Sequence, residues 1–132
     1  MAREALIDRV PIPEKQVHPL RSPDIELPGS FDLILLGIGP DGHTASLFPG
    51  DPALEASGPI VRVDEPGLPP YHPRLTFTYP VLDSARAIVF LVGGADKREI
   101  VERILAGDES LPAARVRARE TFLIADEAAA SR

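Results

Sequence analysis

The sequence predicts an α/β domain built on a mostly parallel sheet, and three observations carry that prediction. Two near-continuous apolar runs, 31–36 and 87–92, are typical of strands that are covered on both faces. Each run ends in glycine, and the second is followed by a segment with helical periodicity. Strands that alternate with helices in this way build layered, mostly parallel sheets. We therefore expect a three-layer, Rossmann-like arrangement in which helices flank the sheet.

The remaining elements are shorter and are separated by prolines. In chain order we expect the last turns of a helix at 2–10, an extended stretch at 16–20, a loop at 21–30, weaker strands at 59–63 and 74–79 around a proline-rich loop at 66–73, and a last strand at 121–125 before a short alanine-rich helix. The helix after the second apolar run spans 95–106, because Ile100, Val101 and Ile104 form one apolar stripe. Gly107 follows at the position of a C-terminal cap.

Length and composition describe one ordinary domain over residues 1–132. The chain is 44% hydrophobic and 26% charged, with a formal net charge of −6. An acidic chain without a Lys/Arg block argues against a nucleic-acid surface, and no apolar run approaches the length of a membrane span. The absence of cysteine excludes disulfides, thiolate metal sites and cysteine nucleophiles, and it favours the reducing cytoplasm.

A literal G-x-G-x-x-G, residues 37–42, directly follows the first predicted strand. In a dinucleotide site the third glycine opens a long helix, but Pro49 and Pro52 end any helix here within two turns. Pro40 also removes one backbone N–H from the loop that would hold a pyrophosphate. We therefore interpret the motif as a false match to a nucleotide site.

The same turn places Asp41 and His43 at the carboxyl end of the predicted sheet, where open α/β sheets bind ligands. Gly39 and Gly42 let the backbone bend sharply there. An imidazole titrates near neutral pH, so His43 can take a proton from water while Asp41 orients the ring. The alternative is that Asp41 caps a turn and His43 is an ordinary solvated residue.

A second candidate site is the segment 93–97, in which two glycines separate a buried strand from a helix. Free backbone N–H groups and a helix N-terminus bind phosphate, and an anion there would explain Lys97 in the first helical turn. The alternative is a solvated Lys97 beside Asp96. Arg74, which follows the proline-rich loop, can reach a phosphate or carboxylate, or else forms a surface salt bridge.

Other chemistry has weaker support in the sequence. His18 and His72 each precede a proline, and we interpret His18 as structural and His72 as a residue at the rim of the site. No His, Asp and Glu residues have the spacing of a metal site, and Ser46 lacks the small-residue turn of a serine nucleophile. We expect no metal and no cofactor.

The segment 31–49, Phe-Asp-Leu-Ile-Leu-Leu-Gly-Ile-Gly-Pro-Asp-Gly-His-Thr-Ala-Ser-Leu-Phe-Pro, closely resembles the signature segment of 6-phosphogluconolactonases. The resemblance continues through 73–76 and 90–97, and more loosely through 2–13 and 126–129, so it covers nearly the whole chain. The related glucosamine-6-phosphate deaminases share the G-x-G-x-D-G-H turn but continue into an Ala-Phe-Asn-Glu-Pro-like stretch. The Thr-Ala-Ser-Leu-Phe-Pro continuation at 44–49 favours the lactonases.

This resemblance implies a fold of the sugar-phosphate isomerase/lactonase type and hydrolysis of 6-phospho-D-glucono-1,5-lactone in the pentose phosphate pathway, without metal or nucleotide. On the matching positions His43 would be the general base, positioned by Asp41 and by the turn that contains Gly39 and Gly42. Arg74 and Lys97 would contact the substrate's phosphate or its developing charge.

The chain departs from the resemblance at its N-terminal side. Family members carry a Gly-Gly-Ser-Thr-Pro-like sugar-phosphate loop and an Asp-Glu-Arg-containing segment there, and neither occurs in this sequence. The chain therefore resembles the C-terminal half of a lactonase that lacks the N-terminal strands. We expect an exposed apolar edge that pairs with a second copy or with the missing half. A deaminase-like enzyme and a non-catalytic sugar-phosphate-binding fragment are the alternative functions.

Overall fold

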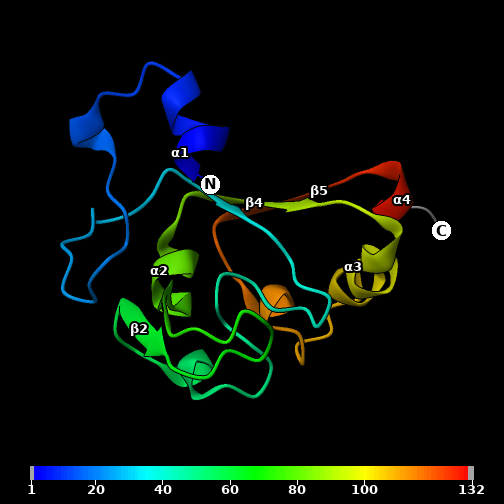
Figure 1. The fold of residues 1–132 in the computed structure, drawn as a ribbon. Helices are drawn as coiled ribbons and strands as arrows, with labels where there is room; N and C mark the ends of the chain where they lie inside the picture. The colour runs from blue at the N-terminus through cyan, green and yellow to red at the C-terminus, as the bar shows by residue number, and fades with distance from the viewer. Residues whose placement is uncertain (1, 131–132) are drawn as a thin grey trace.

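The structure is a computed structural model that describes residues 2–130, and Figure 1 shows its ribbon. In chain order its elements are α1 (Ala2–Ala5), the 3₁₀ turns η1 (Ile7–Arg9) and η2 (Glu14–Gln16), β1 (Leu33–Leu36), η3 (Pro52–Glu55), β2 (Ile60–Val63), β3 (Arg74–Phe77), α2 (Tyr79–Ser84), β4 (Ala87–Val92), η4 (Ala95–Lys97), α3 (Arg98–Leu105), η5 (Pro112–Arg115), β5 (Glu120–Ala125) and α4 (Glu127–Ala130). The longest helix, α3, has eight residues. None of the helices within 2–130 is both long and apolar enough to cross a membrane.

The main sheet has three parallel strands in the order β1-β4-β5. The central strand, β4, pairs with both neighbours, so that Leu36, Phe90 and Leu123 lie side by side across the sheet. Because all three strands run the same way, their carboxyl ends meet at one edge. The predicted mixed α/β class with a parallel sheet and flanking helices is confirmed.

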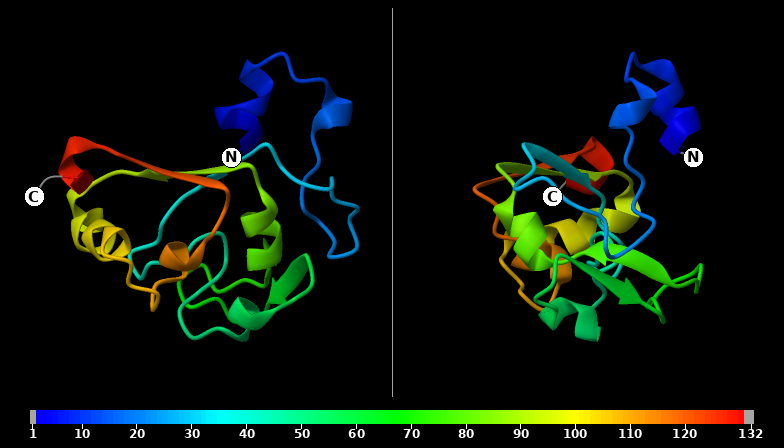
Figure 2. Two further views of the ribbon diagram at one scale, coloured as in Figure 1. Left: turned by 180° about the vertical axis from the view of Figure 1, so that it is seen from behind. Right: turned by 90° about the vertical axis from the view of Figure 1, so that its left-hand side faces the viewer.

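One face of this sheet carries the core. Ile88 is fully buried, and the alternate residues of β1 and β4 that share its face pack with side chains from the helices. The core residues that lie on the strands and on α2 and α3 are Ile34, Ile88, Phe90, Val92, Leu82, Ile100 and Val101. Figure 2 shows α2 and α3 on the same side of the sheet.

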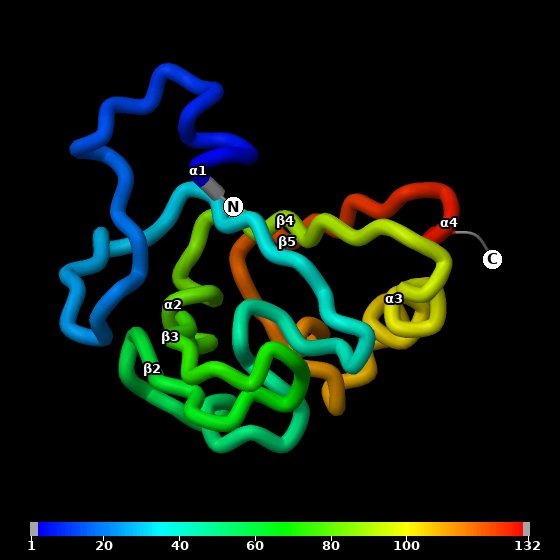
Figure 3. Tube along the Cα trace, viewed as in Figure 1, coloured from blue at the N-terminus to red at the C-terminus, as the bar shows by residue number. Residues whose placement is uncertain are grey.

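The opposite face of the sheet is bare within residues 2–130. Five of its apolar side chains are half-exposed, between 50% and 58%, while Val89 between them is partly buried: Leu33, Leu35, Leu91, Phe122 and Ile124. The helical pieces that precede β1 are single turns that stand apart from the middle of this face, as the Cα trace shows (Figure 3). The helical layer expected on this face is therefore not formed by residues 2–130, because no element there is long enough to cover it. We call these five side chains the open face.

The weaker strands form a separate antiparallel hairpin, β2 with β3, instead of extending the main sheet. The predicted strand at 74–79 ends at Phe77, and Thr78 is the N-cap of the helix α2, which the sequence analysis missed. Pro80 in its first turn is a helix-start signal. Residues 16–20 belong to no strand, because they pair with no other segment.

Candidate active site

A closed turn follows β1 and presents the predicted catalytic residues at the carboxyl edge of the sheet. The Gly39 amide donates to the carbonyl of His43 at 2.8 Å, and the Gly42 amide donates to the carbonyl of Gly39 at 3.0 Å. Gly42 has a φ of +81°, a backbone angle that residues with a Cβ rarely adopt. Two internal hydrogen bonds and a left-handed glycine therefore fix the shape of this turn.

Asp41 and His43 form a close pair within the turn. Asp41 Oδ1 lies 2.6 Å from His43 Nδ1, and the same oxygen accepts the His43 backbone N–H at 3.1 Å. Their side chains are 29% and 20% exposed, so both are partly shielded but reach solvent. A carboxylate can only accept hydrogen bonds, so this contact assigns the proton of a neutral ring to Nδ1 and leaves a lone pair on Nε2.

The imidazole fits against the turn because Gly39 has no side chain. A Cβ at that position would lie 2.0 Å from His43 Nδ1 and 2.8 Å from Asp41 Oδ1. Phe48, which is 2% exposed, packs against the ring with centroids 4.5 Å apart. The ring is thus held by the carboxylate, the bare glycine backbone and a buried aromatic side chain.

A hollow of about 380 Å³ opens beside His43. Its lining consists of the end of β1 and the first part of the turn: Leu35, Leu36, Gly37, Ile38, Gly39, His43 and Ala45. Neither Arg74 nor Lys97 belongs to this lining. The hollow can admit a small ligand to the imidazole, while both cations lie outside its wall.

The loop gives the G-x-G-x-x-G segment no nucleotide-binding geometry. The amides of Gly39, Gly42 and His43 are all used within the turn, so they do not form a free nest for a pyrophosphate. Thr44 pairs with Leu47 in a single bridge, and Ala45 has a φ of +51°, so no helix follows Gly42. This geometry agrees with the argument against a dinucleotide site.

Arg74 lies beyond Phe48, on the first residue of β3. Its guanidinium stands 5.8 Å from the centroid of the Phe48 ring, and its Nη2 donates to the Pro70 carbonyl at 2.7 Å. Phe48 is therefore the side chain that connects Arg74 with His43. Among residues 2–130 the partners of Arg74 are carbonyls of the proline-rich loop, and none of them is the carboxylate that the alternative of a surface salt bridge requires.

Lys97 lies at the carboxyl end of β4, the same edge of the sheet as the turn after β1. Its side chain is only 18% exposed, and its Nζ stands 3.9 Å from Asp96 Oδ2. The expectation of free glycine amides in 93–97 was wrong for Gly94, whose N–H donates to both carboxylate oxygens of Asp126, at 3.1 and 3.0 Å. Asp126 also accepts the Ala129 amide at 2.8 Å, so it joins the loop after β4 to α4.

The other histidines lie away from the pair. His18 lines a separate, mostly apolar hollow of about 340 Å³ together with Phe31 and Phe77. His72 is exposed in the proline-rich loop, where its amide donates to the Pro70 carbonyl. Within the part of the chain that is described, no three His, Asp or Glu side chains gather in a way that could hold a metal ion.

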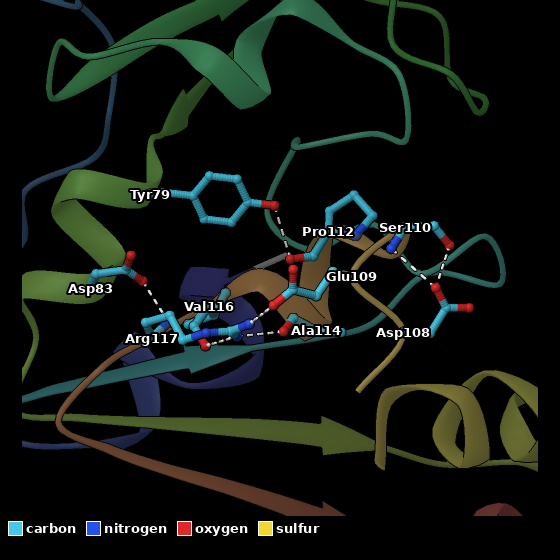
Figure 4. Close-up of polar contacts among 9 residues, drawn as sticks. All are labelled: Tyr79, Asp83, Asp108, Glu109, Ser110, Pro112, Ala114, Val116 and Arg117. Atoms are coloured by element: carbon cyan, nitrogen blue, oxygen red, sulfur yellow. Dashed lines mark hydrogen bonds and ion pairs between the residues drawn. The ribbon is translucent and has the colours of Figure 1, made fainter. Parts of the chain in front are cut away.

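Figure 4 shows polar contacts between α2, η5 and the segment before η5. Burial raises the pKa of Tyr79 to about 12, and its hydroxyl donates to the Pro112 carbonyl at 2.9 Å. Hydrogen bonds lower the pKa of Asp108 to about 2, and the largest effect comes from Ser110, followed by Arg103. These residues belong to no motif that the sequence analysis identified, and their role became visible only through their contacts.

Fold and site together define an α/β protein that presents a carboxylate–imidazole pair at the carboxyl edge of a parallel sheet. The family model described as glucosamine-6-phosphate isomerases/6-phosphogluconolactonase matches residues 1–124. The chain belongs to this family.

Individual relatives agree with the assignment. The 6-phosphogluconolactonase of Homo sapiens is 39% identical in an alignment that covers 97% of this chain and 58% of that protein. The crystal structure of a devB protein superposes with a TM-score of 0.82 at 31% identity and covers 98% of this chain and 64% of that one. A 6-phosphogluconolactonase structure from Thermotoga maritima has a TM-score of 0.67 at 35% identity, over 74% of this chain and 44% of that one. The chain spans about half the length of the curated relatives that it matches.

Proposed function

We propose that this chain carries the hydrolytic centre of a 6-phosphogluconolactonase, which converts 6-phospho-D-glucono-1,5-lactone to 6-phospho-D-gluconate in the pentose phosphate pathway. The observation that carries the proposal is the 2.6 Å contact between Asp41 Oδ1 and His43 Nδ1 beside an open hollow. Relatives named 6-phosphogluconolactonase, 42% and 39% identical to this chain, support the choice of substrate.

The chemistry needs one base and one water molecule. His43 Nε2 takes a proton as the water oxygen attacks the lactone carbonyl carbon, and a tetrahedral intermediate forms. The bond between that carbon and the ring oxygen then breaks, and the imidazolium returns its proton to the leaving oxygen. Asp41 keeps the ring in the correct tautomer and stabilises its positive charge during the reaction. No covalent enzyme intermediate and no cofactor enters this sequence.

The phosphate end of the substrate requires cations, and Arg74 and Lys97 are the residues we propose for it. Lys97 lies at the same edge of the sheet as His43, and Arg74 is one aromatic ring away from it. Gly39 and Gly42 contribute the shape of the turn against which the lactone ring lies. Because neither cation lines the hollow, they act on the far end of the ligand and not on its carbonyl.

A direct assay of lactone hydrolysis, corrected for the spontaneous reaction, tests the proposal. Loss of a positioned base lowers the rate by about 10²–10⁴. We therefore expect His43→Ala to lose that factor and His18→Ala, in the separate hollow, to keep the rate of the unmodified chain. Equal rates for His43→Ala and the unmodified chain would remove His43 from the mechanism.

The same preparation separates the alternative functions. Turnover of glucosamine 6-phosphate without turnover of the lactone would identify a deaminase-like enzyme. Binding of 6-phosphogluconate that is lost in Lys97→Ala, with no turnover of either substrate, would identify a sugar-phosphate-binding fragment. The proposed location is the cytoplasm, where a chain without cysteines needs no oxidising environment to fold.

We further propose that a second polypeptide surface covers the open face. Leu35 on β1 and Phe122 on β5 are 58% and 50% exposed and lie in one row of the sheet, on either side of Val89. Within residues 2–130, β1 is also an edge strand with one side unpaired. Large exposed apolar patches mark association sites, and unpaired edges favour pairing with other strands. The partner is a second copy when the chain is purified alone, or the N-terminal half that longer relatives carry.

Sedimentation equilibrium measures this association directly. We expect a dimer at micromolar concentration and a shift to monomer when Phe122→Lys places a charge on the open face. The matched control for Phe122→Lys is Glu102→Lys, which introduces a lysine on the exposed surface of a helix. Ile104→Lys would not serve as a control, because Ile104 packs on the core. A chain that sediments as a monomer at all concentrations would contradict the proposal.

A further inference from the structure

The short helix η5 braces the turn that carries His43. The Ala113 amide donates to the carbonyl of Gly42 at 3.0 Å, and Leu111 lies directly against the same glycine. A Cβ on Gly42 would meet Leu111 Cδ2 at 2.8 Å, so no space separates the two segments. Leu111 and Ala113 are each 3% exposed. The position of the turn therefore depends on the position of η5.

Helix α2 holds η5 at two points, which Figure 4 shows. At the start of η5, the Tyr79 hydroxyl donates to the Pro112 carbonyl at 2.9 Å. Beyond its end, Asp83 Oδ1 accepts the amide of Arg117 at 2.7 Å. Both contacts join segments more than thirty residues apart, so they are tertiary connections and not part of a local turn.

The ring of Tyr79 is fixed as well. The Arg115 guanidinium lies 5.0 Å from the ring centroid, and its Nη2 stands 3.2 Å from Glu55 Oε1. Burial raises the pKa of the phenol to about 12, so the hydroxyl remains a hydrogen-bond donor throughout the physiological range. The hydroxyl of this partly buried ring therefore has one carbonyl partner and little freedom to leave it.

We propose that Tyr79 is a positioning residue for His43, acting through Pro112, Ala113 and Gly42. The inference rests on the proposed function for its kinetic consequence, but its structural part stands independently of it. The Asp41–His43 pair belongs to the turn that Gly42 closes, so a displacement of Gly42 moves the imidazole relative to the hollow. A misplacement of about 1 Å at a reacting group can reduce a rate about 100-fold.

Tyr79→Phe is the test, because it removes the hydroxyl and keeps the ring beside Arg115. Tyr71→Phe is the matched control, since Tyr71 is 68% exposed. Three nuclear magnetic resonance measurements report on the connection from Tyr79 to His43: the amide exchange rates of Ala113 and of Gly39, and the position of the His43 C2–H signal. Amide exchange of Ile88, a fully buried residue of the central strand, reports on global unfolding.

We expect Tyr79→Phe to accelerate exchange at Ala113 and Gly39, to shift the His43 signal, and to leave Ile88 unchanged. In the lactone assay kcat falls by about tenfold or more while KM changes by less than about twofold. If Tyr79→Phe does not fold, Asp83→Ala loosens the same helix at its other end and must give changes in the same direction. Signals at Ala113, Gly39 and His43 that match the unmodified chain, or equal acceleration at Ile88, would overturn the inference. A chain without lactonase activity whose signals nevertheless change would refute the proposed function and leave the positioning role supported.

Discussion

The substitution Gly39→Ala tests most directly how the imidazole is held. The added Cβ would lie 2.0 Å from His43 Nδ1 and 2.1 Å from Cε1, whereas non-bonded heavy atoms settle at about 3.5–4.0 Å. The ring must therefore move by about 1.5 Å or more. It cannot do so freely, because Phe48 is buried and packs against it. The Cβ would also meet Asp41 Oδ1 at 2.8 Å, so the carboxylate is displaced together with the ring.

The expected loss follows from this displacement. A general base contributes about 10²–10⁴ to a rate, and a ring moved by more than 1 Å no longer delivers that factor. We expect kcat/KM for lactone hydrolysis to fall by about 10²–10⁴, which corresponds to about 3–5 kcal/mol of transition-state stabilisation. The assay is the lactone hydrolysis measurement described above, corrected for the spontaneous reaction.

Two other glycines provide the controls. Gly29→Ala lies in a distant loop where a Cβ meets nothing within 4 Å, and its rate should equal that of the unmodified chain. Gly37→Ala also adds a Cβ in open space, two residues before Gly39, and the C2–H signal of His43 should stay in place. A Gly39→Ala enzyme with an unchanged rate and an unchanged His43 signal would refute the reasoning, because the ring would then tolerate a methyl group where none fits.

Three further predictions concern stability. Because burial raises the folded-state pKa of Tyr79 from 10 to about 12, its stabilising effect is complete below pH 10 and is lost as the pH rises to 12. In Tyr71→Phe, which leaves Tyr79 as the single tyrosine, phenolate absorbance should rise near pH 12, and a midpoint near 10 would contradict the burial. The pKa of Asp108 is lowered from 3.8 to about 2 by Ser110 and Arg103, so its contribution is present above pH 3.8 and is lost as the pH falls to 2. Asp108→Asn should reduce the loss of stability between pH 3.8 and pH 2 in acid unfolding. An acid unfolding curve identical to that of the unmodified chain would argue against the hydrogen bonds from Ser110 and Arg103 to Asp108. Leu82→Ala, at a fully buried side chain, should reduce the free energy of unfolding in urea by about 2–5 kcal/mol, whereas Leu105→Ala at 72% exposure should change it by less than about 0.5 kcal/mol.

The sequence was most informative where local chemistry dominates. The apolar run at 87–92 coincides with β4, and the run at 31–36 contains β1, because β-branched and other apolar side chains favour strands. The same runs predict cover on both faces, and the open face shows that residues 2–130 supply it on one face only. The proximity of Asp41 and His43 was also predictable, since two residues within one glycine turn cannot lie far apart. Pro49 correctly indicated that no helix follows Gly42.

Tertiary contacts decided what the sequence analysis missed. The Gly94 amide is taken by Asp126, and that partner lies thirty-two residues further along the chain. Phe48 counted only as a member of the signature segment, yet its ring joins His43 to Arg74. Helix α2 was missed because the β-branched and aromatic residues before it extend the strand pattern as far as its first residue, Tyr79.

The open face also has a thermal consequence. Unfolding ordinarily raises the heat capacity by about 12–15 cal/mol/K per residue, because apolar groups become hydrated. The five side chains of the open face are already half hydrated in the native chain, so they contribute less to that increase. The stability of this chain should therefore vary more gently with temperature than that of other domains of 132 residues, and its curve should steepen once another surface covers the sheet.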